Sequence, residues 1–168
     1  MYIKLVFVFL FILSAAINDI KYSKISNKLI LISIIFGLSY NVYLNNFAGF
    51  IFSIKGIILP FIALYVLFLM NFLPAGDIKL FMAIGSVLGY QYVFMIIIIS
   101  VFIGGIYSIF LLIKNRKFSD FKKLFVYFKS CVLNMKLLEY NVSESIRFPF
   151  APIVFISYLA FIFVKNMI

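Results

Sequence analysis

The fold class of this chain is decided by residues 78–113, which read IKLFMAIGSVLGYQYVFMIIIISVFIGGIYSIFLLI. Lys79 is the only charged residue in this run. A membrane-spanning helix needs about 20 apolar residues, so the run is too long for one span. The stretch Gly89-Tyr90-Gln91-Tyr92 is the natural break, because glycine permits a turn and tyrosine favours the membrane interface. The run therefore predicts two consecutive membrane helices.

The composition of the whole chain agrees with a membrane protein. Of its 168 residues, 66% are hydrophobic and only 12% are charged, whereas a soluble domain is about half apolar and a quarter charged. A soluble globular fold is therefore excluded. Apolar segments lie near 3–18, 29–44, 47–73, 77–91, 92–113 and 148–165. We predict an all-α polytopic membrane protein with about six transmembrane helices. No repeat or linker divides the chain, so residues 1–168 should form a single domain.

The basic residues predict the orientation in the membrane. The chain has 15 Lys and Arg against 5 Asp and Glu, a net charge of +10. In a membrane protein this excess points to anionic lipid as a partner and not to nucleic acid. Twelve of the 15 lie in alternate connections between spans: Lys21, Lys24, Lys28, Lys79, Lys114, Arg116, Lys117, Lys122, Lys123, Lys129, Lys136 and Arg147. The positive-inside rule places these connections in the cytoplasm and both termini outside.

The long basic loop, residues 114–147, has an apolar pattern of its own. Its large apolar side chains recur at spacings of three and four: Phe118, Phe121, Phe125, Phe128, Val132 and Met135. Such a stripe, with lysines off it, predicts an amphipathic helix lying on the inner leaflet. A helix folded back on the other spans fits the pattern equally well.

Two residue types that serve many enzymes are scarce or missing. The chain has no His, which excludes Ser-His-Asp and Cys-His catalysis and histidine metal sites. Cys131 is the only cysteine, which excludes an intrachain disulfide and a thiolate zinc cluster. We therefore expect neither a metal nor a cofactor.

The acidic residues are few enough to name: Asp19, Asp77, Asp120, Glu139 and Glu144. Three lie in the long loop, but Asp19 follows the first span and Asp77 precedes the fourth. Each of these two begins the tripeptide Asp-Ile-Lys, and the predicted topology brings both to the cytoplasmic side. A carboxylate in a spanning helix costs on the order of 3 kcal/mol, so it is seldom retained without a task. The alternative is an ordinary boundary residue beside a lysine.

A pair of neighbouring carboxyl groups has a definite chemistry. The two cannot both ionise readily, so one keeps its proton. The ionised member can activate a water, and the protonated member can polarise a peptide carbonyl and protonate the leaving amine. This is the chemistry of an aspartic protease. The same pair could instead relay protons or cations across a membrane.

At these residues the chain resembles the type IV prepilin peptidases, membrane aspartic proteases with a Gly-x-Gly-Asp motif. Residues 74–80 read PAGDIKL, where the family has Gly-x-Gly-Asp, an apolar residue and Lys. Residues 19–29 read DIKYSKISNKL, where the family has Asp, a basic stretch and Ile-Pro-Asn. Residues 148–152, FPFAP, are similar to the motif that opens the family's last span.

The resemblance implies a multi-pass endopeptidase of the inner (cytoplasmic) membrane. Such an enzyme removes a short basic leader from pilin-like precursors at the cytoplasmic face. Asp19 and Asp77 would be the catalytic pair, supported by Gly76, Lys79 and Asn27. Gly76 would let another backbone approach the carboxylate, and Asn27 could equally cap the second span. The first span begins near residue 3, so the chain resembles the short, peptidase-only branch that accompanies tight-adherence (Flp) pili, without an N-terminal methyltransferase domain.

The chain departs from the family pattern at two positions. Pro74 replaces the first glycine of Gly-x-Gly-Asp, and Ser26 replaces the proline of Ile-Pro-Asn. These departures keep open a non-catalytic pilus-assembly homologue. A small proton- or cation-coupled transporter would use the same aspartates, but it predicts acids near the middle of the bilayer and an internal repeat. A lipoprotein signal peptidase predicts four spans and an Asn-x-x-Asp motif.

Overall fold

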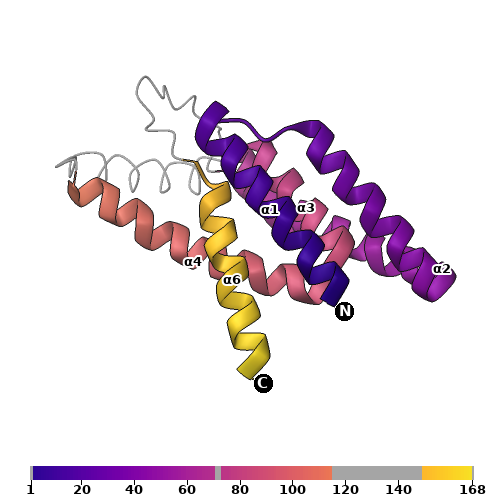
Figure 1. Ribbon diagram of the computed structural model, residues 1–168. Helices are drawn as coiled ribbons and strands as arrows, with labels where there is room; N and C mark the ends of the chain where they lie inside the picture. Colours follow the sequence, from indigo (N-terminus) through magenta and orange to yellow (C-terminus); the bar gives the residue numbers. More distant parts are fainter. Residues whose placement is uncertain (1, 71–72, 115–148, 168) are drawn as a thin grey trace.

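The computed structural model describes residues 2–70, 73–114 and 149–167. The elements in these ranges are α1 (Tyr2–Tyr22), α2 (Asn27–Leu69), α3 (Ala75–Leu88), α4 (Tyr90–Lys114) and α6 (Ala151–Met167). All of them are helices, as predicted, and they pack side by side (Figure 1). The amphipathic helix predicted for the long basic loop lies outside the described residues.

Three of the described helices are long and apolar enough to cross a membrane, namely Tyr2–Tyr22, Asn27–Leu69 and Tyr90–Ser108. The apolar helix Ala151–Lys165 is shorter. Large apolar side chains, such as Phe61 and Phe102, are exposed on the outer surfaces of these helices. An apolar surface of this kind is unfavourable in water but favourable in contact with lipid. The N-terminal end of α1 and the C-terminal end of α6 lie at the same end of the bundle (Figure 1). The count of six spans and the side of the termini stay predictions.

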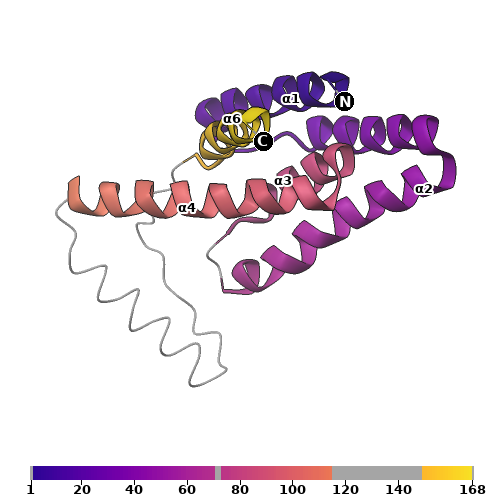
Figure 2. The same cartoon turned by 90° about the horizontal axis from the view of Figure 1, so that it is seen from below.

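Helix α2 contains two of the predicted spans, joined by a sharp reversal. The non-helical residues are Asn45, with φ −133° and ψ 17°, and Asn46, with φ 50° and ψ −131°. They fall between the predicted segments 29–44 and 47–73, and the two arms fold back on each other (Figure 2). The reversal is tight because a Cβ at Gly49 would overlap the backbone carbonyl of Asn41.

Helix α3 is short and central. Its 14 residues extend about 21 Å, and it packs most extensively against α2, with further contacts to α1 and α4. The spacing Gly85-x-x-x-Gly89 is typical of close helix contact. A Cβ at Gly85 would overlap the carbonyl oxygen of Gly56 in the second arm of α2, and a Cβ at Gly56 would overlap that of Gly85. The two backbones therefore touch directly.

A single residue separates α3 from α4. Gly89 has φ 90°, a conformation that glycine adopts without strain, and the Phe52 ring occupies the place of its missing side chain. The break that the sequence predicts at Gly89–Tyr92 is confirmed at Gly89. It consists of one residue because glycine can turn the chain without a longer loop.

A buried polar cluster closes the C-terminal end of α3. The Asn41 side-chain amide donates to the carbonyl oxygens of Gly37 at 2.9 Å and Ser86 at 3.0 Å, and to Ser53 Oγ at 2.8 Å. Lys4 Nζ donates to Asn41 Oδ1. The last carbonyls of a helix have no partner within the helix, and the bilayer core offers no water to replace one. Asn41 therefore satisfies this end of α3 from a neighbouring helix.

Helix α6 packs against α1 and α4. The fully buried Tyr158 side chain donates its O–H to the carbonyl oxygen of Leu5 at 2.8 Å. Lys165 lies over the Tyr92 ring, 4.7 Å from its centroid. These contacts join the last described helix to the first and to α4.

Candidate active site

Asp19 is held in the last turn of α1. The helix continues to Tyr22, beyond the end of the predicted first span, so Asp19 lies inside the helix and not directly after it. Its side chain is only 8% exposed, and its backbone carbonyl accepts the N–H of Ser23 at 2.8 Å. The Asp19 side chain is therefore fixed by a regular helix and faces the interior.

Asp77 lies in the first turn of α3. Pro74 is the N-cap residue, with φ −70° and ψ 151°, and its carbonyl oxygen accepts the N–H of Asp77 at 3.1 Å. The Asp77 side chain is 4% exposed, and its Oδ2 atom is buried without a hydrogen-bond partner in the described part of the chain. The start of α3 therefore turns this carboxyl group inward and leaves one of its oxygens unsatisfied.

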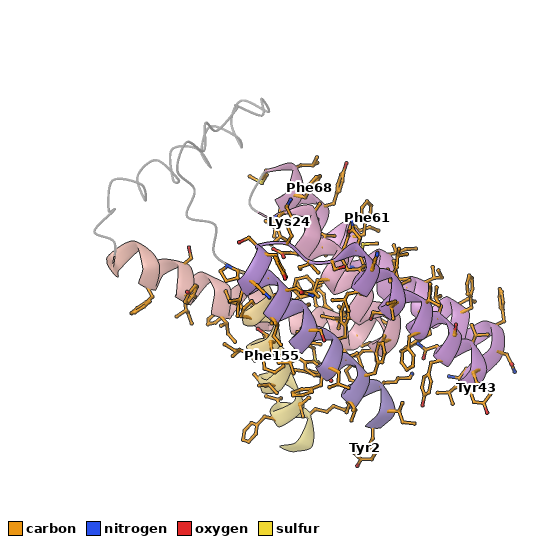
Figure 3. All side chains as sticks on the ribbon, turned by 45° about the horizontal axis from the view of Figure 1, so that its top comes forward. Tyr2, Lys24, Tyr43, Phe61, Phe68 and Phe155 are labelled. Carbon is orange, nitrogen blue, oxygen red and sulfur yellow. The ribbon has the colours of Figure 1, made fainter. Side chains whose placement is uncertain are left out.

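The two aspartates that the sequence singles out come together in the structure. Helices α1 and α3 are in contact, and Asp19 and Asp77 interact electrostatically. Figure 3 shows Lys24, which follows α1, and Phe68, near the end of α2, at one end of the bundle, with Tyr2 and Tyr43 at the other. Asp19, in the last turn of α1, belongs to the end near Lys24. Neighbouring carboxyl groups share protons and titrate as a unit.

The start of α6 supplies a third part of the site. The backbone N–H of Ala151 donates to Asp19 Oδ2 at 3.0 Å. The Phe150 ring meets the Phe81 ring of α3 edge-on, with centroids 6.3 Å apart, and lies against Gly104 of α4. Residues 148–152 indicated the start of a helix, but nothing in their sequence points to Ala151 as a partner of Asp19. Every residue except proline has a backbone N–H, so the donor leaves no sequence signal.

The three residues expected to support the pair, Gly76, Lys79 and Asn27, have different surroundings. Among the residues that the structure describes, nothing lies within 4 Å of a Cβ built at Gly76, so these residues leave space beside the one that precedes Asp77. Lys79 Nζ donates to Asn27 Oδ1 at 3.5 Å. Asn27 is the first residue of α2 and Ser26 is its N-cap, so the interpretation of Asn27 as the cap was wrong by one residue. The Asn27 side chain instead accepts a hydrogen bond from Lys79.

A comparison with protein families places the chain in one of them. The sequence model of the type IV leader peptidase family matches residues 6–109. The chain belongs to this family. The match includes Asp19 and Asp77 and runs from α1 into α4, whereas Ala151 lies beyond it. Searches of curated proteins and of solved structures found no significant match. Family and apolar helices together indicate a peptidase embedded in a membrane.

The two departures from the family pattern fit the local backbone. Pro74 has φ −70°, the value that a proline ring imposes, so the chain needs no glycine there. Ser26 has φ −66° and ψ 122°, which a proline could also adopt. Both positions therefore keep a proline-compatible conformation.

The described residues contain no cluster of metal-binding side chains. Within residues 2–70, 73–114 and 149–167, no group of three or more Cys, Asp or Glu side chains could hold one. The groups that the site presents for chemistry are two carboxyl groups and a backbone N–H.

Proposed function

We propose that this protein removes the short basic leader from type IV pilin-like precursors, with Asp19 and Asp77 as its catalytic pair. One observation carries the proposal. The two family-motif aspartates are both buried, on two helices that are far apart in sequence and in contact in the structure. Burying carboxyl groups costs free energy that an ordinary structural role does not require.

In the proposed reaction the pair works by acid and base catalysis. The ionised carboxylate takes a proton from a water molecule, whose oxygen attacks the carbonyl carbon of the scissile peptide. The protonated carboxyl group donates to the carbonyl oxygen, and a proton then passes to the leaving amine. No step needs a histidine, a nucleophilic side chain or a metal.

The open space beside Gly76 supports an extended substrate segment at this point. A peptide bond must come within hydrogen-bond reach of both carboxyl groups, and a side chain at position 76 would stand in the way. The precursor's apolar helix would lie in the bilayer and its leader at the cytoplasmic face of the inner membrane, beside anionic lipid.

The backbone at the two departures favours a working enzyme over a non-catalytic homologue. Pro74 provides a regular helix cap, and Asp77 follows it in the first turn. Ser26 has a proline-like conformation at the start of α2. Both positions therefore keep a regular start to a helix, which supports a working enzyme, and we extend the proposal to precursors of tight-adherence pili as its substrates.

The test is a cleavage assay with the purified full chain in liposomes. The substrate is a precursor with a basic leader, a Gly at the cleavage site and an apolar helix. We expect Asp19→Asn and Asp77→Asn each to lower the rate by about 10²- to 10⁴-fold, the usual contribution of a general acid or base. The control Asp120→Asn changes a carboxyl group outside both motifs and should leave the rate unchanged.

Two outcomes would contradict the proposal: wild-type rates in either site variant, or no cleavage of any Gly-terminated leader by the wild type. Melting temperatures of the variants show whether they remain folded. Proton or cation flux that needs both aspartates, in the absence of cleavage, would favour the transporter instead.

A further inference from the structure

Asp19 and Asp77 have unlike surroundings, although they occupy one site. Asp19 Oδ2 accepts the N–H of Ala151 at 3.0 Å. Ala151 is the first residue of α6, and the carbonyl of Phe150 accepts the N–H groups of Ile153 and Val154. The N–H of a first helical residue has no acceptor within its own helix. It is therefore free to bind Asp19, and the positive end of the α6 dipole lies beside the carboxylate.

Asp77 has no such support at its Oδ2 atom. It also stands in the first turn of a helix, but none of the N–H groups there reaches this buried oxygen. The ammonium groups of the two Asp-Ile-Lys motifs have other partners, because Lys79 binds Asn27 and Lys21 lies over the Tyr22 ring at 5.2 Å. A buried carboxylate without a donor is costly, whereas a neutral carboxyl group is much less so.

We infer that the N-terminus of α6, through the N–H of Ala151, fixes Asp19 as the ionised member of the pair and leaves the proton on Asp77. The inference rests on the proposed function for its catalytic meaning. It makes Asp19 the general base and Asp77 the general acid, and it makes Ala151 a positioning residue that acts through Asp19. Ala151 lies outside residues 6–109, the segment that matches the family model.

The assignment gives a balanced cycle. Asp19 takes a proton from water, the water oxygen bonds to the carbonyl carbon, and Asp77 gives its proton to the carbonyl oxygen. Asp19 then gives its proton to the amide nitrogen and the C–N bond breaks. A hydroxyl of the intermediate returns a proton to Asp77 as the new carboxyl group forms. Both aspartates end as they began, and the net reaction is the hydrolysis of one peptide bond.

Infrared difference spectra of the full chain in liposomes test the assignment without any substrate. Subtracting the Asp77→Asn spectrum from that of the wild type should leave the C=O band of a protonated carboxyl group. Subtracting the Asp19→Asn spectrum should leave the band of a carboxylate. The reverse pattern, or carboxylate bands in both differences, would overturn the inference. Because no cleavage is measured, the assignment can fail while the proposed function stands, and the reverse also holds.

A change of one backbone atom tests the role of Ala151. Replacing Ala151 by lactate turns its amide into an ester and removes the N–H while the methyl side chain stays. We expect kcat to fall by about 10- to 100-fold, the loss that follows from removing one hydrogen bond to a charged group. KM should change less than twofold, and the carboxylate band assigned to Asp19 should shift.

The matched control is the same amide-to-ester change at Val154. Its N–H donates to the carbonyl of Phe150 at 3.2 Å, within α6 and away from Asp19. This variant loses one helix hydrogen bond and should keep both kcat and the Asp19 band. Equal losses of kcat in the two esters, or an unmoved Asp19 band in the ester at 151, would show that Ala151 has only a structural role.

Discussion

The two ends of α3 are built in opposite ways. At the C-terminal end, Gly85 touches the backbone of α2, Gly89 turns against the Phe52 ring, and the Asn41 amide satisfies the carbonyl of Ser86. At the N-terminal end, a Cβ at Gly76 would meet no described residue within 4 Å. Within the described residues, one helix therefore has a closely packed end with hydrogen-bonded carbonyls and an end with space and an unsatisfied carboxyl oxygen.

This difference indicates how a short helix can hold a reactive group. Packing and hydrogen bonds at one end fix the position of the whole helix, because an α-helix is stiff over 14 residues. The other end then carries a buried carboxyl group that costs free energy and leaves room beside it. Stability and chemistry are thus separated along a single element, and substitutions at the two ends should have separate effects.

The largest expected effect is on stability, from Gly85→Val. The new side chain would overlap the carbonyl oxygen of Gly56 and push α3 away from α2. We expect the free energy of unfolding to fall by about 3 kcal/mol, the upper end of the usual cost of overpacking. The measurement is thermal unfolding in detergent. Gly105→Val is the control, since a Cβ there meets none of the described residues within 4 Å, and equal melting temperatures for the two variants would contradict the close contact.

A smaller loss of stability should follow from Asn41→Leu. The change leaves the carbonyl of Ser86 without the Asn41 donor and Lys4 without its acceptor, whereas the carbonyl of Gly37 keeps the Ser53 hydroxyl as a donor. We expect a loss of about 2 kcal/mol, typical of buried polar groups left unpaired. In a double-mutant cycle, Lys4→Met should cost less in the Asn41→Leu background than in the wild type. If the losses of unfolding free energy from the two substitutions were strictly additive, the polar cluster would not act as a unit.

At the open end, Gly76→Ala should affect activity and not stability. The methyl group enters free space, and alanine favours the helix, so the melting temperature should stay the same or rise slightly. We expect kcat/KM for the precursor to fall about tenfold, or about 1.4 kcal/mol, because the methyl group occupies the path of the substrate backbone. Full activity with an unchanged melting temperature would remove Gly76 from the site.

The smallest effect concerns the connection that leads from Asp19 to α2. Ser26 already has φ −66°, so Ser26→Pro should raise the free energy of unfolding by about 0.4–1 kcal/mol, through the entropy of the unfolded chain, and leave cleavage unchanged. Ser23→Pro is the contrasting control. Ser23 has φ 50° and donates its N–H to the backbone carbonyl of Asp19, so proline at position 23 should destabilise the protein. Similar shifts in melting temperature for both variants would contradict these backbone conformations.

Much of the fold follows from the sequence, because apolar runs and their interruptions are local signals. The segments 29–44 and 47–73 are separated at Asn45 and Asn46, and the reversal occurs there. Gly89 separates α3 from α4 for the same reason. The meeting of Asp19 and Asp77 was also predictable, since both lie at helix ends next to connections that the basic residues assign to one side.

The rest depends on tertiary contacts that leave weak signals or none. Asn41 is a polar residue inside an apolar run, which is a signal of function or buried hydrogen bonding, but its partners lie on three helices. The contact of Gly85 with Gly56 requires knowing which helices pack together. The bond from Ala151 to Asp19 involves a backbone group, which no choice of side chain reveals.

The bond between Ala151 and Asp19 joins residues 132 positions apart. Asp19 therefore leaves the ribosome well before its donor, which follows α1 to α4 in the chain. A nascent chain that has not yet made α6 holds both aspartates but not the N–H that binds one of them. On the function proposed above, the site is complete only when α6 has joined the other helices.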